Sequence, residues 1–98
     1  MFGHRGELSV PPASKADKNA LEIARIWAAA GKQEVTLRPD IWDDPAEWGL
    51  MLVDLARHVA NAYAQTQGRD RAQVLDRIKA GIDAEWSAPT DAPTDAVD

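Results

Sequence analysis

The chain has 98 residues, no cysteine and a formal net charge of −5. This length fits one domain with a single core, and the lack of cysteine excludes disulfides, thiolate nucleophiles and cysteine-bound zinc. The 11 basic residues are scattered among 16 acidic ones, which argues against the clustered positive surface that nucleic acids require. No signal-peptide run and no apolar stretch of roughly 18 residues occurs, so we expect a cytoplasmic protein without a membrane partner.

The N-terminal third predicts a strand and then a helix. Leucine and valine alternate with polar residues over positions 7–10, which predicts a short edge strand that ends at Pro11. Apolar side chains recur at helical spacing on one face of positions 18–30, with Asp17 or Ser14 as the N-cap. Gly31 would supply the left-handed residue that ends this helix.

The middle of the chain predicts a second strand and a long, well-marked helix. Val35 and Leu37 alternate with polar residues over positions 33–38, and Pro39 closes the strand. Asp44 is then followed by Pro45 and, three residues after the Asp, by a glutamate, which is the pattern of a capped helix start. We expect this helix over residues 45–65.

A third helix is expected after Gly68, which would end the long one. Asp70 and Gln73 form another capping pattern, and the apolar residues that follow share one side up to Trp86. Beyond it, the tail over residues 87–98 repeats Ala-Pro-Thr-Asp in tandem and has one large aliphatic residue. Such a segment buries too little to offset its ordering entropy, so we predict a disordered acidic tail.

The long helix has an unusually wide apolar arc. At 100° per residue, one stripe lies within about 60° of Trp48 and is the expected core face. Its members are Trp48, Leu52, Leu55, Val59 and Tyr63. Val53, Ala60 and Ala64 extend the arc beyond what one neighbouring element covers, so this helix is expected to contact two partners.

These elements predict an α+β fold, a small two-layer domain in the order β-α-β-α-α. Residues 1–6 are expected to be a flexible terminus and residues 7–86 the single domain. Two short strands make a marginal sheet, and pairing of the strand at 34–38 or at 7–10 with its own copy would extend it across a two-fold axis. We therefore expect a homodimer.

Five residues on or near the long helix are candidates for an interaction or ligand surface. Trp42 precedes the helix and Trp48 lies in its first turn, and a tryptophan usually seals a core or marks a binding hot spot. Asp54 and His58 are one turn apart, so the carboxylate can orient the imidazole, although such a pair is commonly a simple surface contact. Tyr63 ends the same stripe.

Signals for catalysis, metals and cofactors are lacking in the sequence. The glycines are too dispersed for a phosphate-binding loop, and no serine lies in a nucleophile-elbow pattern. Asp40, Asp43 and Asp44 invite a calcium interpretation, but their spacing fails the EF-hand pattern and turn chemistry accounts for them. We assign no catalytic residue, no metal and no cofactor.

The segment from Lys32 to Ala60, KQEVTLRPDIWDDPAEWGLMLVDLARHVA, resembles a small bacterial family catalogued only as a domain of unknown function, family 5076. The resemblance also touches the segment 19–31 and covers most of residues 7–68. It implies a small stand-alone bacterial protein, and it brings no activity, cofactor or catalytic residue that can be transferred to this chain.

Two functions remain open from the sequence. The leading hypothesis is a non-enzymatic interaction or accessory module that forms a homodimer. It would use the loop at Trp42 and the open side of the long helix for contacts, and an unidentified protein partner is also possible. The alternative is a small-molecule binder or minor enzyme with a pocket near Trp42, Trp48, Asp54 and His58. A third hypothesis is docking of the acidic tail onto basic partners, which would be salt-sensitive.

Overall fold

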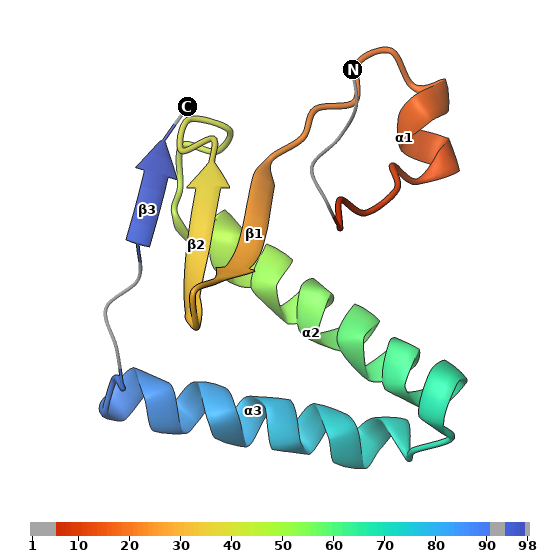
Figure 1. Ribbon diagram of the computed structural model, residues 1–98, viewed down its shortest axis with the longest axis vertical. Coiled ribbons are helices and arrows are strands. Elements are labelled where there is room, and N and C mark those ends of the chain that lie inside the picture. Colours follow the sequence, from red (N-terminus) through yellow and green to blue (C-terminus); the bar gives the residue numbers. More distant parts are fainter. Residues whose placement is uncertain (1–5, 91–93, 98) are drawn as a thin grey trace.

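The computed structural model describes residues 6–90 and 94–97 and has an α+β fold (Figure 1). Its elements, in chain order, are α1 (Pro12–Ala16), β1 (Ala24–Ala29), β2 (Lys32–Leu37), α2 (Ala46–Gln67), α3 (Arg71–Ser87) and β3 (Thr94–Val97). The α+β class is confirmed. The order β-α-β-α-α is wrong, because the first long element is a strand of a β-hairpin.

The predicted helix over residues 18–30 is replaced by β1 and the turn that follows it. Ala30 and Gly31 have φ values of 52° and 75°, and β1 and β2 pair antiparallel with Ala29 opposite Lys32. Two successive residues with positive φ make the two-residue turn that matches the twist of a hairpin. The isoleucines and tryptophan that suggested a helix also favour strands, and pairing with β2 decides between the two.

This turn predicts a stabilising substitution. An alanine in the left-handed region costs about 1–2 kcal/mol, whereas asparagine tolerates that region well. We expect Ala30→Asn to raise the free energy of unfolding by about 1 kcal/mol, measured as a higher urea midpoint at fixed protein concentration. Ala29→Asn, one residue earlier in the strand, is the control. An equal gain from both variants would contradict this explanation.

The predicted strand over residues 7–10 is also wrong. The segment Gly6–Pro11, called here the N-terminal arm, has no regular secondary structure and leads into the short helix α1, which the sequence did not suggest. The arm is tied to β1 by an ion pair of 2.9 Å between Glu7 and Arg25. A side-chain contact thus takes the place of the expected strand pairing, because four alternating residues are a weak strand signal.

The predicted long helix is confirmed as α2. The Asp44 carboxylate accepts a hydrogen bond of 3.0 Å from the Ala46 N–H, so the expected aspartate satisfies a free amide at the start of the helix. Gly68 ends the helix with φ 65°, and its N–H donates to the Ala64 carbonyl. The left-handed glycine is therefore in the expected place.

The start of α3 is also as expected, since the Asp70 carboxylate accepts a 3.0 Å hydrogen bond from the Gln73 N–H. Removing such a cap costs about 1 kcal/mol. We expect Asp70→Ala to lower the free energy of unfolding by about this amount in urea titrations. Asp76→Ala removes an exposed carboxylate inside the same helix and is the control; similar losses in both variants would show that general charge, and not capping, is responsible.

The sheet has the order β1-β2-β3, with β3 parallel to β2. In the tail that we expected to be disordered, Thr94–Val97 therefore pair with Glu34–Leu37. Positions 91–93 and 98 of that tail lie outside the described residues. The same holds for positions 1–5 of the expected flexible terminus. Because β2 has a neighbour on each side, it cannot extend the sheet across a dimer. The outer strands of the sheet are β1 and β3.

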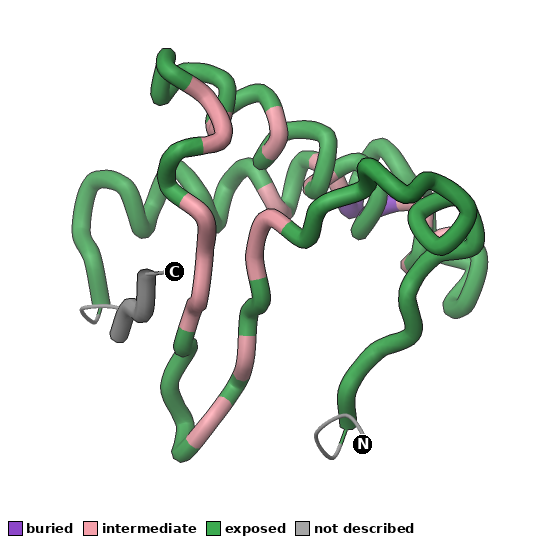
Figure 2. The backbone as a smooth tube through the Cα atoms, turned by 90° about the horizontal axis from the view of Figure 1, so that it is seen from above, coloured by how far each residue is buried: buried purple, intermediate pink, exposed green. Residues whose placement is uncertain are grey.

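The sheet and the helices form an open arrangement. Among the described residues, the elements that pack closely are β1 with β2, β2 with β3, and α2 with α3. In Figure 2 the buried residues, coloured purple, occupy only a small part of the helical region. The accessible surface is 8441 Å², against about 5,500 Å² for a compact protein of this mass. The radius of gyration, 15.4 Å, likewise exceeds the usual value of about 13 Å.

No helix in the described part of the chain combines the length and the apolar character needed to cross a bilayer.

Candidate interaction surface

Helices α2 and α3 pack through the small residues of α2. Ala60 is completely buried and Val74 of α3 nearly so, and among the described residues these two alone are buried. Ala56 and Ala64, one turn before and after Ala60, are half-buried. Small side chains let the two helices approach closely near the turn that joins them. The alanine side of α2 is therefore its contact with α3.

The stripe that we expected to be the core face of α2 is open instead. Leu52, Leu55 and Val59 are 54%, 41% and 38% exposed, and we call these three residues the open stripe. The stripe lies roughly 100° around the helix from Ala60, so α3 does not reach it. Of the two partners expected for α2, the described residues supply one, which is α3. The alanine side has its partner in the chain, whereas the leucine side has none among the described residues.

The far end of α3 adds further exposed apolar surface. Figure 1 shows α2 and α3 joined at one end and diverging toward the other. Leu75 and Ile78, in the first half of α3, are half-buried, whereas Ile82 is 49% and Trp86 86% exposed. A tryptophan exposed to this degree is unusual in a monomer, because its large apolar ring is costly to hydrate.

Trp42 and Trp48 are brought together by the loop between β2 and α2. The centres of their rings are 5.1 Å apart and the ring planes are inclined by 82°, which is an edge-to-face arrangement. Both residues are half-buried. Because each indole covers the other, the pair fastens the loop to the first turn of α2, and such pairs add about 0.5–1.5 kcal/mol beyond burial.

Asp54 and His58 lie on the exposed polar side of α2. The Asp54 carboxylate forms an ion pair of 3.5 Å with Arg57, on its own helix. His58 is exposed. Trp48 and His58 are ten residues apart, or about 15 Å along the helix axis. The structure therefore joins the two tryptophans but spreads the other candidates along α2.

Tyr63 has a structural partner at the end of α2. The guanidinium of Arg69 lies 5.2 Å from the centre of the tyrosine ring, a cation–π contact. Nearby, the Arg71 Nε donates a hydrogen bond to the Asn61 Oδ1. Both contacts link the end of α2 to the residues that begin α3. Tyr63 thus helps to hold the helical turn.

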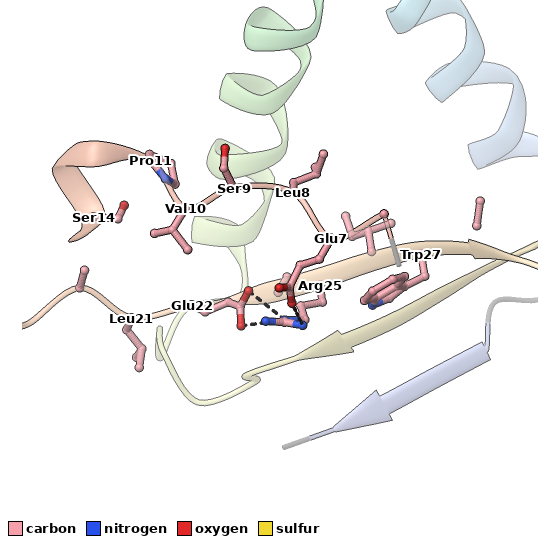
Figure 3. Close-up of a pocket in the computed structure, with 15 residues that line it drawn as sticks. Glu7, Leu8, Ser9, Val10, Pro11, Ser14, Leu21, Glu22, Arg25 and Trp27 are labelled. Atoms are coloured by element: carbon pink, nitrogen blue, oxygen red, sulfur yellow. Dashed lines mark hydrogen bonds and ion pairs between the residues drawn. The ribbon is translucent and has the colours of Figure 1, made fainter. Parts of the chain in front are cut away.

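A groove that the sequence did not suggest lies between the N-terminal arm and β1. Its volume is about 710 Å³, and Leu8, Val10, Leu21 and Ile26 are among its lining residues. Figure 3 shows Glu22 and Glu7 both reaching Arg25 beside this groove, at 2.9 Å each. These contacts, the one with Glu22 first, raise the pKa of Arg25 above its ordinary value. Glu22 and Arg25 are close in sequence, whereas Glu7 and Arg25 are 18 residues apart, so no local sequence signal could have found the contact that closes the cluster.

Within residues 6–90 and 94–97, no three His, Cys, Asp or Glu side chains are grouped as metal ligands would be. In the aspartate-rich loop, Asp44 acts at the start of α2 as described above.

A known structure shares this fold. It comes from the photosynthetic bacterium Rhodopseudomonas palustrus CGA009 and is provisionally described as that of a pyruvate dehydrogenase. It is 34% identical in sequence, with a TM-score of 0.71, and the match covers 96% of this chain and 95% of that chain. A search of the curated proteins found no match.

The family model described as domain of unknown function, DUF5076, matches residues 7–90. This range contains the N-terminal arm, the hairpin and both long helices, and the resemblance noted in the sequence is confirmed. The chain belongs to the DUF5076 family.

Proposed function

We propose that this chain is a homodimeric interaction module in which a second copy covers the open stripe of α2. The observation that carries the proposal is the exposure of Leu52, Leu55 and Val59 on a helix whose other apolar side is already packed. A single helix stripe that repeats along its axis is self-complementary across a two-fold axis. Burying it twice, once from each copy, would complete the core that one chain lacks.

The amount of exposed surface supports a second copy as the occupant. The chain exposes about 2,900 Å² more than a compact protein of its mass. Obligate homodimers bury roughly 2,000–5,000 Å² in total, which is about 1,000–2,500 Å² from each partner. The excess, summed over the whole surface, is comparable with the area that one partner of such an interface buries. Ile82 and Trp86, at the open end of the helical pair, enlarge the apolar area that association would cover.

The alternative, a ligand pocket near Trp42, Trp48, Asp54 and His58, is less well supported by the geometry. The two indoles contact each other edge to face, Asp54 pairs with Arg57, and His58 lies about 15 Å from Trp48 along the helix. A small ligand would not touch all four. The description of the Rhodopseudomonas protein names a reaction for that relative; for this chain, the open stripe is the feature that points to a function.

Light scattering of the purified chain tests this proposal. At micromolar concentration we expect a single species with twice the mass of one chain, stable on dilution to the nanomolar range if the interface is obligate. A monomer at micromolar concentration, with the helical circular-dichroism spectrum retained, would contradict it.

A further inference from the structure

Within the part of the chain that the structure describes, strand β1 is paired along one edge, by β2. In the hairpin, Arg38 N–H donates to the Ile23 carbonyl at 3.0 Å, which places Ile23 opposite Arg38 as a hydrogen-bonded pair. Hydrogen-bonded residues alternate along an antiparallel strand, so Ala24, Ile26 and Ala28 direct their N–H and C=O groups away from β2. Within the described residues, no hydrogen bond engages these outward groups.

The strand β1 itself lacks several of the features that protect an exposed edge. Proteins usually block such edges with proline, lysine, a bulge or an inward-pointing charge. From Ala24 to Ala29 the strand contains no proline and no lysine, and its register with β2 is unbroken. Its central outward residue, Ile26, is 56% exposed. The edge is thus suited to receive another strand.

A groove lies beside this edge. It runs between β1 and the N-terminal arm (Figure 3), and its lining residues include Ala24, Ile26 and Ala28. The ion pair between Glu7 and Arg25 holds the arm at this position. A strand inserted here would pair with the outward backbone groups of β1, and the apolar side chains Leu8 and Val10 line the same groove.

We infer that the strand received here is β1 of a second copy, paired antiparallel about a two-fold axis at Ile26. The inference rests on the proposed homodimer and specifies where its two chains join. Each Ile26 would lie opposite the partner's Ile26, and Ala24 opposite the partner's Ala28. The two three-stranded sheets then become one continuous sheet. Helix α2 leaves the sheet on the β1 side in Figure 1, so the same copy can reach the open stripe.

The register follows from the hydrogen bonds that each alternative allows. A two-fold axis at Ile26 uses all three outward residues of each strand, whereas a shift of the axis by one residue leaves one of them unpaired. An axis at Arg25 would also set two guanidinium groups directly opposite one another, which is unfavourable.

The axis at Ile26 instead sets Arg25 opposite the partner's Trp27. The Arg25 Nε and Nη1 donate in the guanidinium plane to Glu22 and Glu7, and this arrangement keeps the flat face of the group available for stacking on an indole. Charge and shape thus agree with the register that hydrogen bonding favours.

Cysteine cross-linking tests this register, because the natural chain has no cysteine. Hydrogen-bonded antiparallel partners have Cα atoms about 5.5 Å apart, a distance that a disulfide spans. We expect Ile26→Cys to form a covalent dimer in a mild glutathione redox buffer, reversed by dithiothreitol on a denaturing gel. Ala28→Cys is the matched control, because its own copy would lie about 13 Å away, four residues along the partner strand.

A mixture of the single variants Ala24→Cys and Ala28→Cys should also cross-link, since these positions face one another across the axis. This second measurement leaves Ile26 unchanged. All variants should keep the circular-dichroism spectrum of the natural chain.

Two results would overturn the inference if light scattering shows a dimer. In the first, neither Ile26→Cys nor the mixture cross-links. In the second, Ala28→Cys alone cross-links as readily as Ile26→Cys. The proposed function would survive either result. A monomeric natural chain would overturn both.

Discussion

Leu52→Asp is expected to convert the dimer into monomers. Burying a leucine side chain contributes about 1.5–3 kcal/mol, and a two-fold axis doubles the loss because both copies carry the change. An aspartate at this position would also have to lose its hydration in an apolar contact. Together these effects should raise the dimer dissociation constant by at least about a hundred-fold, measured by sedimentation equilibrium over a range of concentrations.

A matched control is available on the same helix. Gln65 is exposed on the polar side of α2, and Gln65→Asp adds the same charge there. We expect its dissociation constant to stay within a few-fold of that of the natural chain. Since Leu52 is half exposed in one chain, the Leu52→Asp monomer should keep its helices. An unchanged dissociation constant for Leu52→Asp would show that the open stripe is not the interface.

Ala60→Asp is expected to cause the largest loss of stability. Ala60 is the one completely buried residue among those described, and it lies on the side of α2 that packs against α3. A buried carboxylate without a partner typically costs about 3–5 kcal/mol. With a urea m-value of about 1–3 kcal/mol/M, the unfolding midpoint should fall by more than about 1 M at fixed protein concentration.

Two comparisons separate this effect from a general effect of charge. Gln65→Asp again adds the charge at an exposed position, and its midpoint should change little. Ala60→Leu adds volume without charge and should cost about 1–3 kcal/mol through overpacking, so it remains informative if Ala60→Asp has no cooperative transition. A midpoint for Ala60→Leu at or above that of the natural chain would contradict the close packing of α2 on α3.

Local sequence patterns were sufficient wherever backbone hydrogen bonding is satisfied locally. The hydrogen bond of Asp44 just before α2 is present, although Pro45 and not Asp44 is the N-cap, and the end of α2 at Gly68 and the start of α3 at Asp70 are as predicted. In each case one side chain or one left-handed residue satisfies groups within a few positions of itself. The strand β2 was also predicted, because its alternation is uninterrupted and a proline ends it.

The prediction failed where a segment had to choose between local and distant partners. Residues 24–29 have apolar side chains that suit a helix face, and they form a strand because the turn at Ala30 and Gly31 brings β2 beside them. The reverse held for residues 7–10, where a strand-like pattern found no neighbouring strand. Propensity is weak in both segments, so pairing decides the outcome.

The sequence by itself determined the α+β class, the long helices with their ends, and the excess of apolar surface on α2. The tertiary structure alone decided which part of that surface remains open. Helix α3 packs against the alanine side because small residues permit close approach, and the leucine side, roughly 100° away, is then out of its reach. The same folding leaves β1 at the edge of the sheet. The surface expected to be core is therefore the surface from which we infer association.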